Sequence, residues 1–416
     1  MKASMLYCRA LSIYVAVATL AGCGAQTSPP LGSSLSSRAS VAQPHASRGF
    51  AVLYSFGGGR DGGVPVANLI ALNGTLYGTT EFGGTGSCYS YGLSGCGTVF
   101  AITISGKEHV LHRFRAGSDG EYPLAGLIAV NGKLYGTTGY GGGSGCGGSG
   151  TGCGTVYEVD TSGKERVLYR FKGAPDGGEP FSQLVSSNGR LYGTTSGGGA
   201  SNAGTIFEVS TSGKERVLYS FSGGSYAGPL AGLTSYGGTL YGTTAREGKL
   251  GAGTVFALSS SGKERLVHNF GKSDDGAEPY AALAVFNGRL YGSTVEGGLA
   301  CSGIGSGDTC GTVFEVGPSR SERVVHRFNG GDGAWPYAGL IEVDGRLYGT
   351  TKLGGNHGGG SVFEVSASGK EKILYSFDGT DGELPVAGLL YLNGGLYGTA
   401  SFGGANNAGT VFRVAP

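Results

Sequence analysis

Few residues of this sequence combine a reactive or recognising side chain with a position in a loop. Arg246, Glu247 and Lys249 stand out because the other loops offer mainly Gly and Ser at this place, and four further candidates join them: Tyr140, Trp335, Lys352 and His357. Aromatic rings beside a few charges suit a sugar, which offers a flat apolar face and directional hydroxyl groups. The pattern favours glycan binding, against the plainer interpretation that these are ordinary loop residues.

Signatures of the common catalytic classes are absent from the sequence. It contains no Gly-x-Ser-x-Gly and no His-x-x-x-His, and the match Gly145-x-Gly147-x-x-Gly150 lies inside a cysteine-bracketed loop with no helix after it. His357 with Arg246 and Glu247 would still suit a polysaccharide lyase or hydrolase. We therefore expect no cofactor, and catalysis stays open.

Eight cysteines are present, and two of them, Cys8 and Cys23, belong to the N-terminal segment. The other six form three local pairs, each in a loop of 15 or 16 residues: Cys88 with Cys96, Cys146 with Cys153, and Cys301 with Cys310. In an exported protein such pairs form disulfides. The alternative is metal binding, but two thiols per loop without Cys-x-x-Cys or an adjoining His argue against it, so we expect no metal site.

These loops are positioned by a repeat built on Leu-Tyr-Gly-Thr-Thr. Its tyrosines recur seven times at intervals near fifty residues: Tyr77, Tyr135, Tyr192, Tyr241, Tyr291, Tyr348 and Tyr397. A period near fifty is typical of a four-stranded propeller blade rather than of a helical repeat.

Each repeat resolves into four short β segments. In the second repeat we expect strands at 124–130, 133–138, 154–160 and 164–171, with two-residue turns inside each hairpin. The first segment is rich in small residues, which suits a crowded channel wall. No stretch has an apolar period of 3.6 residues, so we expect no helix outside the N-terminal segment.

The two ends of the repeat region complete each other. The region begins at 50–56 with a strand of the fourth type and ends at 409–414 with one of the third type. Pairing 51–56 with 410–414 would finish the last blade and cover two strand edges. The sequence therefore predicts an all-β, seven-bladed propeller of four-stranded antiparallel blades, closed by its N-terminal strand.

In such a propeller every long connection lies on one face, here named the long-loop face. It carries the loops between second and third strands and the crossings between blades, so function is expected there. The crossings contain a recurring Asp-Gly, at Asp61, Asp119, Asp176, Asp275, Asp332 and Asp381. This ring of carboxylates would either line the channel mouth and hold a cation such as calcium or, as we favour, cap its own turns.

The repeats, with Asn-Gly-x-Leu-Tyr-Gly-Thr-Thr, Gly-Thr-Val-Phe-Glu-Val and Gly-Lys-Glu-x-Val-Leu-Tyr-Ser-Phe, resemble the GloVer-type tandem repeat of exported bacterial proteins. The resemblance covers roughly residues 50 to 416. It implies a propeller outside the cytoplasm, and it brings no agreed activity and no catalytic residues. The Tyr and Thr of the hairpin strand recur in nearly every unit, so we expect them to pack and hydrogen-bond between blades.

The N-terminal segment is similar to a bacterial lipoprotein signal. An apolar run at 11–21 precedes Leu20-Ala21-Gly22-Cys23, so we expect a signal peptide at 1–22, lipidation of Cys23 and a flexible tether at 23–48 before the propeller at 49–416. Gly24, not being Asp, favours the outer membrane. Ordinary secretion is the alternative.

The formal net charge of +1 leaves no basic field for nucleic acid. The expectation is therefore a monomeric, lipid-anchored protein of the cell envelope that binds a glycan or another surface polymer. Two alternatives stay open: a carbohydrate-active enzyme of the same fold, and a protein-interaction scaffold for an envelope protein. A convergent acid and base at the channel mouth would favour the enzyme, an aromatic shelf would favour binding, and a flat apolar rim would favour the scaffold.

Overall fold

The computed structural model describes residues 49–90, 92–143, 145–146, 152–224, 227–271, 275–301, 308–317 and 321–416. The expected signal peptide, Cys23 and the tether lie outside these residues. Within them, no helix is long and apolar enough to cross a membrane.

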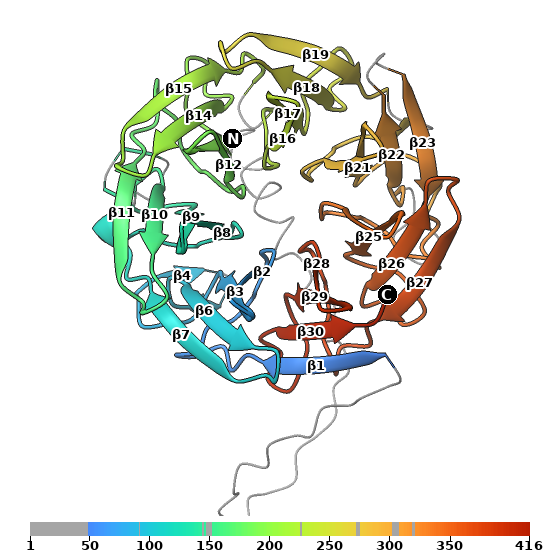
Figure 1. Cartoon of the computed structure of the whole chain (residues 1–416), viewed down its shortest axis with the longest axis horizontal. Helices are drawn as coiled ribbons and strands as arrows, with labels where there is room; N and C mark the ends of the chain where they lie inside the picture. Colours follow the sequence, from blue (N-terminus) through green and yellow to red (C-terminus); the bar gives the residue numbers. More distant parts are fainter. Residues whose placement is uncertain are drawn as a thin grey trace, which may run out of the picture. The chain divides into compact units, whose positions relative to one another are not determined.

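Seven four-stranded antiparallel sheets form a ring, which confirms the predicted propeller (Figure 1). From the axis outward, blade 1 consists of β2 (Ile70–Leu72), β3 (Thr75–Thr80), β6 (Thr98–Thr103) and β7 (Glu108–Arg113). Blade 2 consists of β8 (Ile128–Val130), β9 (Lys133–Thr138), β10 (Thr155–Val159) and β11 (Glu165–Arg170). Blade 3 consists of β12 (Val185–Ser187), β13 (Arg190–Thr195), β14 (Thr205–Ser210) and β15 (Glu215–Ser220).

Blade 4 consists of β16 (Thr234–Tyr236), β17 (Thr239–Thr244), β18 (Thr254–Leu258) and β19 (Glu264–Asn269). Blade 5 consists of β20 (Ala284–Phe286), β21 (Arg289–Thr294), β22 (Thr312–Val316) and β23 (Glu322–Arg327). Blade 6 consists of β24 (Ile341–Val343), β25 (Arg346–Thr351), β26 (Ser361–Ser366) and β27 (Glu371–Ser376). Outside the blades, β4 (Tyr89–Ser90) and β5 (Leu93–Ser94) form a small hairpin. The short 3-10 turn η1 (Gly117–Asp119) departs from the expectation of no helix.

Blade 7 is closed as predicted, because β28 (Leu390–Leu392), β29 (Gly395–Ala400) and β30 (Thr410–Val414) are completed by β1 (Phe50–Ser55). The strands β1 and β30 pair in antiparallel register from Phe50 opposite Val414 to Ser55 opposite Thr410. Phe50 is only 4% exposed and joins the cores of blades 6 and 7. The ends of the repeat region therefore share one sheet, in which the facing edges of β1 and β30 are paired.

The innermost strands are shorter than expected. In blade 2 the predicted strand 124–130 is reduced to β8, and the residues before it run close to their neighbours around the axis. A Cβ atom on Gly126 would lie 3.1 Å from the carbonyl oxygen of Asn68 in the neighbouring blade. The small residues of this segment thus allow the seven equivalent segments of the chain to converge at the axis, as the sequence indicated. The residues before β8 are not part of a β-strand.

A ring of side-chain hydrogen bonds joins every blade to the next. The hydroxyl group of the first residue of the Thr-Thr pair donates to a backbone carbonyl of the following blade: Thr79 to Ala125, Thr137 to Pro180, Thr194 to Ala231, Thr243 to Ala281, Ser293 to Ala338, Thr350 to Ala387 and Thr399 to Ala67. Each bond is worth about 1 kcal/mol. The predicted role of this threonine between blades is therefore confirmed, and the ring continues across the seam.

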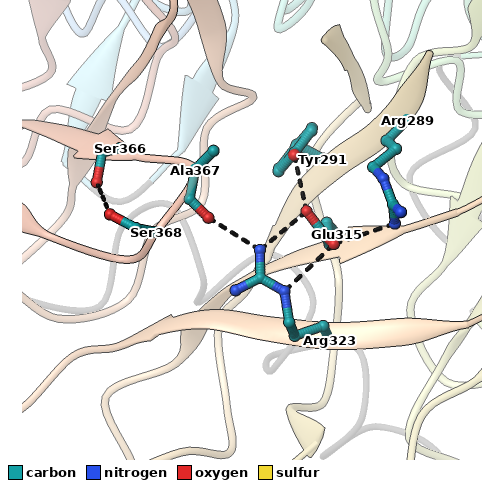
Figure 2. Close-up of polar contacts among 7 residues, drawn as sticks. All are labelled: Arg289, Tyr291, Glu315, Arg323, Ser366, Ala367 and Ser368. Atoms are coloured by element: carbon teal, nitrogen blue, oxygen red, sulfur yellow. Dashed lines mark hydrogen bonds and ion pairs between the residues drawn. The ribbon is translucent and has the colours of Figure 1, made fainter. Parts of the chain in front are cut away.

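The recurring glutamate of the third strand is also occupied by contacts between strands and blades. Glu315 accepts hydrogen bonds from Tyr291, Arg289 and Arg323, and Arg323 also donates to the carbonyl oxygen of Ala367 in blade 6 (Figure 2). Burial would raise the pKa of Glu315, but the hydrogen bonds from Arg323 and Tyr291 outweigh it and hold the pKa below its usual value. These charges hold the blades together near the short turns.

The three predicted disulfides, Cys88–Cys96, Cys146–Cys153 and Cys301–Cys310, are formed. Each closes a loop of at most ten residues. By lowering the conformational entropy of the unfolded chain, each stabilises the fold by roughly 2.5 kcal/mol. Disulfides of this kind are typical of proteins that fold outside the cytoplasm.

The Asp-Gly carboxylates cap their turns, as we favoured, but they do not line the channel mouth. Asp61 accepts from the backbone N–H of Gly57 at 2.7 Å, and Asp176 from that of Lys172 at 3.0 Å. Both also accept from a tyrosine near the end of an outermost strand, Tyr54 and Tyr169. The favoured interpretation is therefore confirmed, and the alternative of a carboxylate ring at the channel mouth is wrong, because Asp61 and Asp176 bond to tyrosines of outermost strands.

Replacing Glu108 with Gln is expected to raise the free energy of unfolding at pH 8 and leave it nearly unchanged at pH 4. Burial, and then the charge of Asp61, raises the pKa of Glu108 from 4.5 to about 7. Since the folded pKa exceeds the unfolded one, the stability from this group is complete below pH 4.5 and is lost as the pH rises through 7.

Partial solvent screening reduces the expected gain at pH 8 to about 1 kcal/mol. Chemical denaturation at the two pH values measures it, with the exposed residue Glu342, as Glu342→Gln, for comparison. An equal effect of Glu108→Gln at both pH values would contradict the raised pKa.

Candidate ligand-binding site

An inner rim on the long-loop face is formed by two sets of equivalent positions. The first set flanks the proline that precedes each innermost strand, and the second follows each Thr-Thr pair. The two sets are bonded to each other, since the backbone N–H of Lys352 donates to the carbonyl oxygen of Trp335, and that of Gly139 to Tyr122. Because the blades repeat, side chains at these positions lie at similar heights around the axis.

Aromatic side chains occupy this rim over blades 1 to 3. The ring of Tyr122 meets that of Phe82 at 5.4 Å and that of Tyr140 at 6.2 Å, both edge to face. Tyr140 in turn meets Phe181 at 5.7 Å. Tyr122, Tyr140 and Phe181 remain partly exposed. They form a continuous aromatic arc that crosses two blade boundaries.

A second aromatic group lies over blades 5 and 6. Tyr280 and Tyr337 have ring centroids 5.4 Å apart, and the Lys352 ammonium group lies 5.1 Å from the Tyr337 centroid and 5.9 Å from that of Trp335. Burial lowers the pKa of Lys352 from 10.5 to about 8. The lysine therefore presents its charge among aromatic faces rather than to bulk water.

Trp335 is held in place by its backbone and its indole. Its φ angle of 57° is left-handed, which is uncommon for a residue other than glycine. Its backbone N–H donates to Cys310 and its indole N–H to Thr309 at 3.1 Å, both at the end of a disulfide-closed loop. The tryptophan is thus preorganised, with part of its side chain still exposed.

Arg246 is engaged by an acidic partner. Its guanidinium group donates two hydrogen bonds to Glu278, at 2.7 and 3.2 Å, and Tyr280 donates to the same carboxylate at 2.8 Å. Hydrogen bonding to Glu278 raises the pKa of Arg246 further. Arg246 and Glu278 therefore form an oriented ion pair at the end of the second aromatic group.

The other three predicted residues lie toward the outer strands. Glu247 accepts from the backbone N–H of Gly223 at 3.0 Å, in the crossing where Ser225-Tyr226 replaces Asp-Gly. The backbone N–H of Lys249 donates to Asn269, the last residue of β19. His357 contacts Ser376, the last residue of β27. The structure thus brings Tyr140, Arg246, Trp335 and Lys352 to the inner rim and leaves these three away from it.

Glu81 is a rim residue that the sequence analysis did not select. The residue is 6% exposed, burial raises the pKa of its carboxyl group to about 8, and its Oε2 has no hydrogen-bond partner among the described residues. Lys352 occupies the equivalent position in blade 6, with blade 7 between the two. The rim thus pairs Arg246 with Glu278, while Glu81 and Lys352 belong to separate blades, which favours binding over acid–base catalysis.

Two solved structures are similar to this chain at low sequence identity. A gluconolactonase from Xanthomonas campestris is 15% identical over 88% of this chain and 89% of its own, with a TM-score of 0.40. A proposed 6-phosphogluconolactonase from Bacteroides uniformis is 14% identical over 77% and 86%, with a TM-score of 0.47. Similarity at this level concerns the fold alone.

No curated protein matches the sequence. The model of the Gloeobacter/Verrucomicrobia repeat, in contrast, matches residues 86–306 and 304–416, which together make up most of the chain. This match agrees with the tandem repeat described above. The chain therefore belongs to the Gloeobacter/Verrucomicrobia repeat family.

Proposed function

We propose that this protein binds a glycan or a related cell-surface polymer across the inner rim of its long-loop face. The observation that carries the proposal is the placement of partly exposed aromatic rings at equivalent rim positions on both sides of the axis. Tyr122, Tyr140 and Phe181 form one group, and Trp335 and Tyr337 the other. Two such groups suit an extended chain of sugar rings rather than a single monosaccharide.

The polar groups of the rim are suited to directional recognition. Lys352 is 3% exposed and its ammonium group stands beside Trp335 and Tyr337, so its positive charge can attract the oxygen atoms of a sugar stacked on these rings. Arg246 is already oriented by Glu278, which lowers the entropy lost on binding. Polar donors beside rigid aromatic rings are the usual composition of a sugar site.

A binding screen of the full chain in detergent against neutral, acidic and amino-sugar polysaccharides tests the proposal. For each polymer that binds, Trp335→Ala and Tyr140→Ala are each expected to raise the dissociation constant about tenfold, which is a loss of about 1.4 kcal/mol of binding free energy. The matched control is Tyr236→Ala, because Tyr236 is 41% exposed but precedes a short turn on the opposite face. Equal affinity in all three variants would place the site elsewhere.

Two other functions are separated by the same samples. Analysis of the polysaccharide after incubation would reveal shortened or unsaturated products if the protein were a lyase or hydrolase. Binding without products supports recognition alone. Absence of binding to every polymer would remove the glycan proposal and favour a scaffold for an envelope protein.

We also propose that Cys23 is lipidated and anchors the propeller to the outer membrane. Support comes from the Leu20-Ala21-Gly22-Cys23 motif and from the disulfides, which are typical of an exported protein. The wild-type protein is expected in the membrane fraction and Cys23→Ser in the soluble or precursor fraction. Equal fractionation of both would support ordinary secretion.

A further inference from the structure

Three clusters of His, Asp and Glu recur at the perimeter, well away from the inner rim. Each combines a histidine and an aspartate of one blade junction with a glutamate at the start of the next outermost strand: His112, Asp119 and Glu165; His268, Asp275 and Glu322; His326, Asp332 and Glu371. Within each cluster one nitrogen and two carboxylate oxygens all lie within 4.8 Å of one another. They join blades 1 and 2, 4 and 5, and 5 and 6.

In each cluster, the distance between the histidine and the aspartate suits two ligands of the same metal ion. The distance from histidine Nε2 to the nearest aspartate oxygen is 3.3 Å for His112 and Asp119, and 3.2 Å for His268 and Asp275. In the third cluster, His326 and Asp332, it is 3.1 Å. Two ligands of a tetrahedral zinc ion, each roughly 2.1 Å from the metal, lie about 3.4 Å apart.

The histidine and the aspartate of each cluster are held in place by neighbouring groups. While Oδ1 of Asp119 faces His112, its Oδ2 accepts from the backbone N–H of Arg115 at 2.9 Å. The imidazole of His112 packs edge to face on Phe114 at 4.8 Å. The other two clusters repeat both contacts, with backbone donors Gly271 and Asn329 and with rings Phe270 and Phe328. Such contacts from a second layer orient metal ligands.

The glutamate offers a free ligand atom. The Oε1 atoms of Glu165, Glu322 and Glu371 are shielded from solvent and accept no hydrogen bond from the residues that the structure describes. Shielding a carboxylate oxygen without a partner is costly, and a cation would remove that cost. The same atom of Glu108 and Glu215 is also unpartnered, so the histidine is what distinguishes the three clusters.

The other junctions supply a natural comparison. Tyrosine stands in place of the histidine at Tyr54 and Tyr169, where its hydroxyl group donates to Asp61 and Asp176. A neutral phenol is a poor metal ligand, whereas a neutral imidazole is a common one. Since Tyr and His occupy the same place in one fold, exchanging them changes the ligand set while keeping the packing.

We propose that the clusters at His112, His268 and His326 are three divalent-metal sites, suited to Zn²⁺, that link adjacent outermost strands. Each site takes one imidazole nitrogen and two carboxylate oxygens from the protein and completes its coordination with water, since the side chains are partly exposed. The ion bridges two blades, so its binding stabilises the closed ring.

The proposal is tested by equilibrium dialysis of the metal-stripped full chain in detergent against Zn²⁺ at pH 7.5. Wild type is expected to bind three ions, each of His112→Tyr, His268→Tyr and His326→Tyr two, and the triple variant none. Tyr169→His, beside Asp176 and Glu215, is expected to bind a fourth. Zn²⁺ should raise the melting temperature of the wild type and not that of the triple variant.

Fewer than one ion per chain, or a stoichiometry that the triple variant retains, would overturn the proposal. Retention would assign binding to other residues such as His109 and His357. Far-ultraviolet circular dichroism of each variant verifies folding, and Tyr already stands at this position in other blades. Failure of this test leaves glycan binding intact, because the clusters lie outside the inner rim.

Discussion

Replacing Phe50 with Ala is expected to lower the free energy of unfolding by about 3 to 5 kcal/mol, the cost of deleting a well-packed aromatic side chain. Phe50 is 4% exposed, and its ring stacks on Tyr375 with centroids 3.5 Å apart and packs near Phe377 and Phe412. It begins the strand that closes blade 7. The lost stability would therefore come from the pairing of β1 with β30, the two ends of the repeat region, which no short connection holds together.

Urea denaturation of the wild type and of Phe50→Ala measures this effect. Tyr89→Ala serves as the control, because Tyr89 is 72% exposed in the small hairpin of a loop and its loss should change stability by less than about 0.5 kcal/mol. A loss below 1 kcal/mol for Phe50→Ala would show that the ring does not depend on the seam.

Replacing Arg246 with Met is expected to destabilise the protein by about 2 kcal/mol, since Glu278 then loses its cationic partner in a largely buried place. The side chain of Glu278 is 15% exposed and that of Arg246 31%. Tyr280 alone continues to donate to the carboxylate. The double variant Arg246→Met/Glu278→Met should recover most of the loss, because no unpaired charge remains.

Thermal or chemical unfolding of the two single variants and the double variant gives the coupling energy. Additive losses would contradict a coupled pair. The double variant also tests the pair in recognition: if it folds like the wild type but binds a polysaccharide less tightly, the Arg246–Glu278 pair contributes to ligand binding.

The architecture was predictable because the same strand and turn pattern recurs seven times in the sequence. The period, the turns and the mismatched ends at 50–56 and 409–414 give blade number, strand order and closure without any long-range information. The length of the innermost strands was not predictable, because it depends on contacts such as that between Gly126 and Asn68, which come from different blades. Pairing within a blade is a local property, whereas crowding at the axis belongs to the ring.

The candidate site was predictable in part. Tyr140, Trp335 and Lys352 were found because they depart from their copies in other units. Tyr122 and Tyr337 were missed, although they flank the proline before an innermost strand, a position that each unit marks. A comparison of the seven units at that proline would have found them.

Glu247 shows where deviation from the repeat misleads. Glu247 differs from its copies, yet its carboxylate binds Gly223 in the crossing that lacks Asp-Gly. For the Asp of Asp-Gly, the favoured capping bond is confirmed, but the sequence alone could not reject the alternative at the channel mouth, because it does not say at which end of a crossing a turn lies. A substitution that repairs a missing contact resembles a functional one until coordinates separate them.

Closure by β1 has a consequence for biogenesis. Ser55 pairs with Thr410, so the opening strand is made and exported 355 positions ahead of its partner. During that interval six blades can assemble in order along the emerging polypeptide, while β1 must be kept from joining the open edge of an incomplete neighbour. Vectorial synthesis therefore makes the last step of maturation a single long-range capture, and factors that shield nascent β-strands after translocation would act at that step.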